Sequence, residues 1–498
     1  MTLAAALAAA LLARTAGAFT AVAPDPAWPA AGVTVAVQTY GRGSLHTIPD
    51  GDGGLILAWQ DARGLDPASC NCRSMDDLYA QRLDAKGTKR WGADDLAVCK
   101  WRGIWGGSDF LVGLYPDGAG GAVVAWDHAD GPAGTFARRV TRDGTMTWGA
   151  EGSTVFEHEL GLKFTARSAR LGREVWLGLD AAEETRVRIS PCVLSTRAMN
   201  CDPPQEFALP AQFQTVSILA GPSPGACLLV FTTRTGAGGI CWAWPVGAGA
   251  PGEARRLLEA DEAGFPVQLQ PDGEGGVWAA AVVRAPPPAA GPPASVPAGT
   301  PLPPPFAGPG LTFSGQSARS AADAALPCDL RVQHGDAAGR PLWGPGVTVA
   351  AVASPATPFA IAASPRGDLA VGWMDAGDPA HIRVRFFDRA GLPRTPQPIV
   401  LADRAERTRP IGLLATPQGW IVTWTEWEAG ATESLRAAWL TGAGAAPPGG
   451  AEPPRGSVVL RRNDAVMLER LVSTPGGAFV FAFDRSVKAL LAFRLRAD

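Results

Sequence analysis

The chain has 498 residues, of which 46% are hydrophobic, and it is rich in Gly (60), Pro (45) and Trp (17). Its formal net charge of -3, without any run of like charges, excludes the electrostatic footprint of a nucleic-acid-binding or membrane-surface protein. Many turn residues in an apolar chain predict short strands joined by tight turns, with few helices.

Residues 1–18 have the features of a secretory signal peptide. An Ala/Leu core spans residues 3–13, and Ala16-Gly17-Ala18 offers small residues for cleavage. The alternative is a short buried helix, because Met1-Thr2 carries no Lys or Arg and the segment is too brief to cross a bilayer of about 30 Å. We expect a secreted or periplasmic protein without a membrane span, either a monomer or part of a larger extracellular assembly.

The eight cysteines of an exported chain predict disulfides. Cys192 and Cys201 flank an expected strand connection, and Cys227 and Cys241 lie on two successive expected strands, so each pair is a candidate for a local bridge. The connectivity of the other four cysteines is open. The closely spaced pair at 70 and 72 lacks a second spaced pair or a suitable His, which disfavours zinc, and we predict no metal site.

The first repeat unit is the clearest along the chain. Its four expected strands span 44–48, 55–59, 78–83 and 96–99. The second unit repeats this pattern, with expected strands at 110–114, 122–126, 135–140 and near 154. Four strands joined by turns predict one antiparallel sheet for each unit.

A Gly-rich turn separates the first two strands of each of these units. In the turn Pro49-Asp-Gly-Asp-Gly-Gly54, Asp50 and Asp52 could present oxygens to a calcium ion. The sister turns place Ala119 and Glu274 where the first turn has Asp52, so the acids are not a constant set. We therefore interpret these segments as hairpin turns that need Gly for positive φ.

A second motif ends the third strand, with a short polar residue, Gly three residues later and Trp seven residues later. It occurs as Asp84 to Trp91, Thr141 to Trp148 and Asp336 to Trp343. A large ring between neighbouring sheets buries much apolar area, so we predict a structural role for these tryptophans.

Eight units are visible when the residue near the end of each second strand is followed along the chain. We take these residues to be Trp59, Trp126, Gly178, Phe231, Ala281, Trp373, Trp424 and Phe483. One long step contains a Pro/Ala/Gly-rich tract over 285–325, which is expected to be an inserted loop. Four strands in each of eight units predict an all-β, eight-bladed β-propeller that occupies residues 27–498 as a single domain.

The two chain ends predict how this propeller closes. The eighth unit has three expected strands and then stops. The missing strand is expected at the N-terminus, because Trp28 to Val35 repeats the spacing of Trp148 to Val155. We therefore predict that the N-terminal strand completes the last blade and removes an open edge.

The units resemble the repeats of secreted bacterial β-propeller proteins, which read PDGxGG, then AW, then YAQRLD, then Gly and Trp. The resemblance covers nearly the whole mature chain, most clearly the first two units, and implies export and a propeller without an established reaction. The units are also distantly similar to eight-bladed quinoprotein dehydrogenases. Those enzymes use adjacent cysteines, whereas Asn71 separates the nearest pair here, and no Cys-x-x-Cys-His haem motif occurs, so we expect no cofactor.

Functional residues are expected on the long loops of one face, which come from 60–77, 100–109, 128–134 and the Pro-rich insertion. The candidate binding residues are Trp101, Arg102, Trp105 and Asp109, together with Asp61, Arg63, Asp127 and His128. Their rings and polar groups suit a sugar or a peptide, although the aromatics would equally pack their own loop.

Two functions follow from this face. We predict a binding or scaffolding module for a protein or glycan, with no nucleic-acid partner. The alternative is a carbohydrate-active hydrolase, for which Asp61 and Asp127 are the pair of acids at strand ends. The expected first strands at 359–362 and 411–414 contain few acids, which favours binding, and no catalytic residue is assigned.

Overall fold

The computed structural model describes residues 19–20, 22–37, 45–61, 77–99, 109–128, 134–149, 152–157, 164–171, 174–181, 186–194, 199–203, 205–208, 213–223, 226–235, 238–247, 252–261, 267–284, 328–352, 357–375, 381–402, 409–417, 419–428, 432–440, 457–462, 466–474, 477–484 and 486–497. Within these ranges the chain forms strands and turns but no helix, as its composition predicts. No helix of these ranges is therefore long and apolar enough to cross a membrane. The predicted signal peptide and the 285–325 insertion lie outside the described residues.

The described strands form eight antiparallel sheets, numbered here in chain order. The first sheet contains β4 (His46–Pro49), β5 (Leu55–Asp61), β6 (Asp77–Leu83) and β7 (Leu96–Cys99). The second contains β8 (Asp109–Pro116), β9 (Ala122–His128), β10 (Gly134–Val140), β11 (Met146–Thr147) and β12 (Ser153–Glu157). The third contains β13 (Phe164–Leu171), β14 (Glu174–Ala181), β15 (Arg186–Leu194), β16 (Met199–Cys201) and β17 (Gln205–Ala208). The fourth contains β18 (Phe213–Ala220), β19 (Cys227–Thr235), β20 (Gly238–Val246) and β21 (Arg255–Asp261).

The remaining four sheets follow the same order. The fifth contains β22 (Gln268–Pro271), β23 (Val277–Arg284), β24 (Cys328–Gly335) and β25 (Val347–Val352). The sixth contains β26 (Phe359–Ala363), β27 (Leu369–Asp375), β28 (His381–Phe387) and β29 (Ile399–Ala402). The seventh contains β30 (Arg409–Thr416), β31 (Gly419–Glu428), β32 (Thr432–Leu440), β33 (Ser457–Arg462) and β1 (Phe19–Thr20). The eighth contains β34 (Val466–Thr474), β35 (Gly477–Asp484), β36 (Ala489–Ala497), β2 (Val22–Pro24) and β3 (Val33–Val37).

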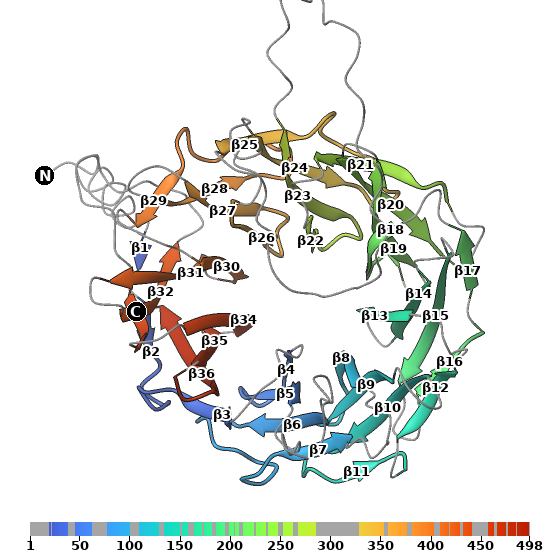
Figure 1. Cartoon of the computed structure of the whole chain (residues 1–498), viewed down its shortest axis with the longest axis vertical. Helices are drawn as coiled ribbons and strands as arrows, with labels where there is room; N and C mark the ends of the chain where they lie inside the picture. The colour runs from blue at the N-terminus through green and yellow to red at the C-terminus, as the bar shows by residue number, and fades with distance from the viewer. Residues whose placement is uncertain are drawn as a thin grey trace, which may run out of the picture.

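Figure 1 shows the sheets set around a common centre, with strands such as β4, β8 and β34 on the inside. Second strands such as β5 are fully buried because both of their faces pack against other sheets. Shared apolar clusters join the first sheet to the second, the fifth to the sixth, the sixth to the seventh and the seventh to the eighth. Another cluster joins the eighth sheet to the first, where Trp28 and Phe479 lie beside Leu57. The core therefore lies between the sheets.

A β-bulge recurs in the fourth strand of most sheets. One residue is skipped in the pairing of the third strand with the fourth, and each skip falls at the same place in the unit. The skipped residues are Val98, Val155, Leu257, Val349, Leu401 and Val459. In the pairing of β3 with β36 the skipped residue is Val35, so β3 takes the place of a fourth strand in the eighth sheet.

The same register tests the residues used to count the units. In six sheets the counted residue of the second strand pairs with the third-strand residue that comes directly after the register shift opposite the bulge. These counted residues are Trp59, Trp126, Phe231, Ala281, Trp373 and Trp424. In the eighth sheet that position is Ala482, opposite Leu491, and not the predicted Phe483. The prediction was wrong by one residue, and in a strand this exchanges one face for the other.

Two of the motif tryptophans connect neighbouring sheets as predicted. Trp91 is 3% exposed, and its indole Nε1 donates to the carbonyl oxygen of Arg142 in the second sheet's motif at 3.1 Å. A Cβ on Gly391, in the turn after β28 of the sixth sheet, would lie 2.8 Å from the Trp343 ring, so a Gly in one sheet makes room for the motif Trp of the preceding sheet. Trp148 differs, because it lies in none of the apolar clusters of the described residues and has a φ of 73°.

The N-terminal segment makes the same kind of contact. Trp28 Nε1 donates to the carbonyl oxygen of Ala85 at 2.7 Å, and a Cβ on Gly87 would lie 3.2 Å from the Trp28 ring. The strand pairs β1–β32 and β2–β36 add backbone hydrogen bonds ahead of the expected domain start at residue 27. The N-terminal segment thus contacts the seventh, eighth and first sheets.

The strand register has different consequences for the two candidate disulfides. Cys227 and Cys241 are both free thiols, so that predicted bridge was wrong. Cys241 lies opposite Thr232, five residues along β19 from Cys227, which is about 17 Å at the rise of a strand and too far for a disulfide. Burial raises the pKa of each thiol to about 12. Cys192 lies directly opposite Cys201 in the β15–β16 pair, and a bridge between them stays a prediction.

The contact between the eighth and first sheets is expected to depend on pH through His46. Arg470 of β34 donates to the carbonyl oxygen of Leu45 at 2.7 Å, and burial together with the charge of Arg470 lowers the pKa of His46 to about 4. Because the His pKa in an unfolded chain is about 6.5, the unfolded state binds the proton first as the pH falls. Stability should therefore fall between pH 6.5 and pH 4, by about 2.5 kcal/mol from pH 7.5 to 4.5 for this group.

Urea unfolding of the wild-type chain and of His46→Gln at both pH values measures this contribution. The variant should lose about 2.5 kcal/mol less than the wild type between pH 7.5 and 4.5, because Gln does not titrate. An equal pH dependence in both proteins would assign the effect to other groups.

Candidate functional site

The structure describes only part of the predicted loop site. Trp101, Arg102, Trp105 and Arg63 lie outside the described residues. Asp109 and His128 are direct partners in the β8–β9 register, so their backbones are adjacent at one end of the second sheet. The binding role predicted for these six residues stays a prediction.

Asp61 and Asp127, the predicted pair of acids at strand ends, do not occupy equivalent positions. Both are buried, with 0% and 5% of their surfaces exposed. Asp61 comes two residues after Trp59, whereas Asp127 comes one residue after the equivalent Trp126, so the two side chains project from opposite faces of their sheets. The Trp59 indole Nε1 donates to Asp61 Oδ2 at 3.2 Å, and Thr135 Oγ1 donates to Asp127 Oδ1 at 3.4 Å.

A different set of charged residues gathers at the opposite end of the first sheet, where the turn between β4 and β5 lies. Asp50 Oδ1 accepts hydrogen bonds from the backbone N–H groups of Asp52 and Gly54 at 2.8 and 2.7 Å. Gly54 is needed there because a Cβ would lie 2.1 Å from the carbonyl oxygen of Leu83. Gly51 and Gly53 each have a φ of 84°, which confirms the hairpin-turn interpretation, and the contacts of Asp50 add a structural role for the first Asp.

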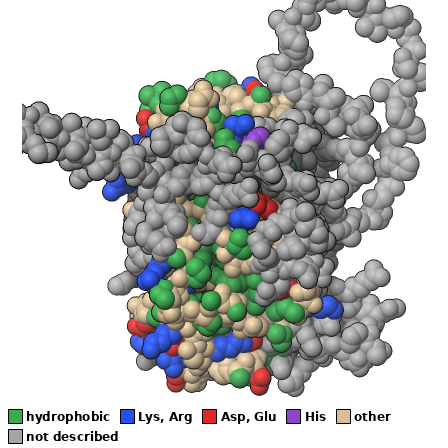
Figure 2. Space-filling view, turned by 90° about the vertical axis from the view of Figure 1, so that its left-hand side faces the viewer, with side chains coloured by type: hydrophobic (Ala, Val, Ile, Leu, Met, Phe, Trp, Pro, Cys, Tyr) green, Lys and Arg blue, Asp and Glu red, His purple; other side chains and the backbone are tan. Residues whose placement is uncertain are grey.

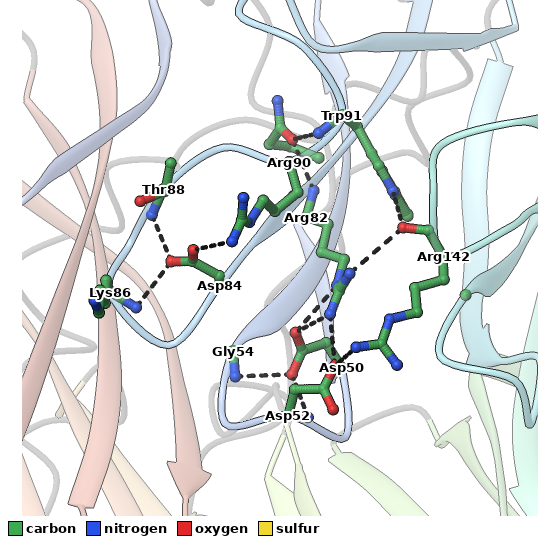
Figure 3. A network of polar contacts seen from close by, with 12 residues as sticks. Asp50, Asp52, Gly54, Arg82, Asp84, Lys86, Thr88, Arg90, Trp91 and Arg142 are labelled. Atoms are coloured by element: carbon green, nitrogen blue, oxygen red, sulfur yellow. Dashed lines mark hydrogen bonds and ion pairs between the residues drawn. The ribbon is translucent and has the colours of Figure 1, made fainter.

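The other carboxylate oxygen of Asp50 connects the turn to the third strand and, through Arg82, to the second sheet (Figure 3). Arg82 Nε and Nη2 donate to Asp50 Oδ2 at 3.1 and 2.9 Å, and Nη2 also contacts Asp52 Oδ2 at 2.8 Å. Arg142, from the second sheet's motif, reaches the same Asp52 oxygen. One network of charges therefore joins two neighbouring sheets.

The network recurs between the fifth and sixth sheets. Asp272 accepts from the backbone N–H groups of Glu274 and Gly276, and His334 replaces Arg82, with Nε2 2.9 Å from Asp272 Oδ2. Arg389 of the sixth sheet contacts Asp272 at 3.3 Å, as well as Glu274. Although burial acts to raise the pKa of Asp272, the hydrogen bonds from His334 and from the two backbone N–H groups hold it below its usual range. The Asp of this turn therefore has the same structural role in at least two sheets.

An open groove of about 810 Å³ lies beside the first of these networks. Residues of the first and second sheets line it together, five of them cationic and three acidic. The lining residues are Asp52, Arg82, Asp84, Ala85, Lys86, Arg90, Ala119, Arg139, Thr141, Arg142 and Asp143. The volume of this groove falls within the range of small-molecule pockets.

The cations of the groove fall into two groups. Arg82 and Arg139 are mostly buried, with 10% and 13% of their side chains exposed, and each is held by a buried Asp of its own sheet's turn. Arg90 and Arg142 have 55% and 58% of their side chains exposed, and Lys86 is also exposed.

Charged side chains of both signs gather toward the lower end of the view in Figure 2, while hydrophobic ones are scattered over its middle. Among the described residues, no group of three or more His, Cys, Asp or Glu side chains could hold a metal ion.

Sequence reasoning missed this groove because it placed function only on the long loops. One signal was available, since Asp follows Pro in the turns at 49–54, 116–121 and 271–276. In the first unit, the Arg that pairs with Asp50 is Arg82, 32 residues further along the chain. Arg142, which Arg82 contacts in turn, lies another 60 residues along.

No protein-family model matches the chain, and no curated protein matches it. Among solved structures, it is similar to the WD40 domain of SCAP from fission yeast, at 8% identity over 96% of this chain and 94% of that one, with a TM-score of 0.49. It is also similar to a PL25 ulvan lyase, a polysaccharide lyase, at 9% identity over 93% and 95%, with a TM-score of 0.42. A puromycin-hydrolysing peptidase from Mycobacterium tuberculosis shares 14% identity over 90% and 61%, with a TM-score of 0.40.

These likenesses bear on the fold at most, and no activity follows from them. The class is defined by the chain itself, through four-stranded antiparallel sheets made from consecutive strands and set around a common centre. The protein is therefore all-β and of the β-propeller type.

Proposed function

We propose that the chain is a binding module built on an eight-bladed β-propeller whose N-terminal strands complete the last blade. Three observations support the closed ring. The bulge at Val35 matches the fourth strands of the other sheets, Trp28 docks on the first sheet's motif, and one apolar cluster joins the eighth sheet to the first. A closed ring leaves no sheet without a neighbour, which suits a rigid scaffold for recognition.

The proposed binding site is the groove between the first and second sheets. Its walls belong to two sheets that an ion network fixes in place, so its shape is set before a ligand arrives. Its exposed cationic ends belong to Lys86, Arg90 and Arg142. A preformed site loses little conformational entropy when a ligand binds, which favours recognition.

No observation on the described residues favours the hydrolase alternative. Asp61 and Asp127 are buried on opposite faces of their sheets, and each accepts a hydrogen bond from a neighbour. Paired carboxylates that act on a glycosidic bond must face a shared substrate. We therefore keep binding of a protein or glycan, by a secreted or periplasmic protein, as the proposed function.

A capture experiment tests the proposal. Immobilised chain 19–498 is exposed to the source organism's secreted proteins and to a glycan array, beside a Lys86→Glu/Arg90→Glu double variant. The control is Arg366→Glu, which changes an exposed Arg on the turn between the first and second strands of the sixth sheet. A partner held by the wild type and the control but lost by the double variant supports the proposal. If every captured partner binds the double variant equally well, the groove is not the site.

A further inference from the structure

The hydrogen-bonding capacity left in the groove is mainly that of donors. Lys86 has no hydrogen-bond or ion-pair partner for its ammonium group among the described residues. Arg90 uses Nη2 on Asp84 at 3.0 Å, and Arg142 uses Nη2 on Asp52, so each guanidinium keeps further N–H groups directed to solvent. Three exposed cationic ends therefore remain able to donate to a ligand.

The three acids of the groove, in contrast, already have partners. Asp52 Oδ2 accepts from Arg82 Nη2 at 2.8 Å and pairs with Arg142, and the other two acids are held by their own turns. Asp84 Oδ1 accepts from the backbone N–H groups of Lys86 and Thr88 at 2.8 and 2.9 Å, and its Oδ2 holds Arg90. Asp143 accepts from the Thr141 hydroxyl and from the backbone N–H of Thr145. These contacts hold the pKa of Asp143 below its usual range, with the Thr141 hydrogen bond as the largest cause. The acids therefore offer few sites to a ligand that donates hydrogen bonds.

The described residues that line the groove also include no aromatic side chain. The nearby Trp91 is 3% exposed, and its Nε1 is engaged by the carbonyl oxygen of Arg142. A flat aromatic face is the usual platform for an amphipathic ring, so its absence from the lining makes the groove a poor site for stacking a sugar. Separate Arg and Lys donors instead match carboxylates carried along an extended chain.

We propose that this groove binds an acidic segment of a partner protein, in which Asp or Glu carboxylates pair with Lys86, Arg90 and Arg142. The inference rests on the proposed binding function of the same groove and names its ligand class. The segment lies across the boundary between the first and second sheets, because Lys86 and Arg90 belong to the first and Arg142 to the second. Binding should weaken with salt, since the three cations are exposed.

Fluorescence anisotropy at low salt tests the ligand class with a labelled Glu/Gly decapeptide, its Gln/Gly counterpart and a sulfated oligosaccharide. The wild-type chain should bind the Glu peptide at least about tenfold more tightly than the Gln peptide. The Lys86→Glu/Arg90→Glu variant should lose about tenfold or more, while Arg366→Glu should keep the wild-type affinity. Thermal unfolding checks that both variants stay folded, with melting temperatures within a few degrees of the wild type.

Three outcomes would overturn the inference. These are equal affinity for the Glu and Gln peptides, unchanged affinity in the double variant, or binding of the sulfated oligosaccharide alone, which would identify a glycan site. Each leaves the proposed function standing if the capture experiment still finds a groove-dependent partner. If, in addition, every captured partner binds the double variant as well as the wild type, the groove is not a binding site at all.

Discussion

Replacing Trp28 with Ala is expected to lower the free energy of unfolding by about 3–5 kcal/mol, because a nearly buried indole is lost from a contact between two sheets. Trp28 is 5% exposed and packs edge-on against Phe479, with ring centroids 5.1 Å apart. Its Nε1 donates to the carbonyl oxygen of Ala85, which would lose this partner. Guanidinium unfolding of the chain 19–498, followed by tryptophan fluorescence and circular dichroism, measures the loss.

Trp148 provides a matched control for this prediction. It occupies the corresponding place in the second unit's motif but is partly exposed and lies in none of the apolar clusters of the described residues. Trp148→Ala should therefore cost about 1 kcal/mol, well below the loss at Trp28. Equal losses at the two positions would mean that the N-terminal contact does not hold the eighth sheet to the first.

The strands were predictable because their signals are local. Alternating apolar residues and Gly-rich turns place β5, β6 and β7 within two residues of their observed bounds. The N-terminal strand was predictable for a similar reason, since the interval from Trp28 to Val35 copies one inside the chain. Repetition makes a distant pairing visible because the same local pattern has the same position in every unit.

Register was less predictable than strand position. Cys227 and Cys241 do lie on adjacent strands, but adjacency does not fix which residues face each other. The slip from Ala482 to Phe483 has the same origin, because the eighth unit lacks a Trp to mark the position. In each case a shift along the strand changes the contact completely, and the sequence has no local feature that reports it.

The groove was not predictable from any one segment. Its walls come from the first two units, where Asp50 and Asp117 hold the buried Arg82 and Arg139, whereas Lys86, Arg90 and Arg142 stay exposed. Which Arg is structural and which is exposed depends on contacts between turns far apart in the sequence. The spacing of motifs along the sequence therefore predicted the turns but not the groove that residues of several turns line together.

Replacing Asp50 with Ala is expected to lower the free energy of unfolding by about 3–5 kcal/mol, because it leaves the buried Arg82 without its main counter-ion. The Asp50 side chain is fully buried, and that of Arg82 is 10% exposed. The substitution also removes the acceptor for the backbone N–H groups of Asp52 and Gly54. Asp52→Ala is the control, since the side chains of Asp52 and its partner Arg142 are 45% and 58% exposed and its other partner, Arg82, keeps Asp50, so it should cost less than about 1 kcal/mol.

A second substitution separates the buried charge from the turn. In the Asp50→Ala background, Arg82→Met should recover about 1–2 kcal/mol, because it removes the unpaired charge and keeps most of the apolar volume. The hydrogen bonds of the turn stay lost, so recovery should be partial. Urea unfolding of the two single variants and the double variant gives the coupling energy directly. Additive losses would show that Arg82 is solvated well enough without Asp50, and that the turn hydrogen bonds alone account for the cost.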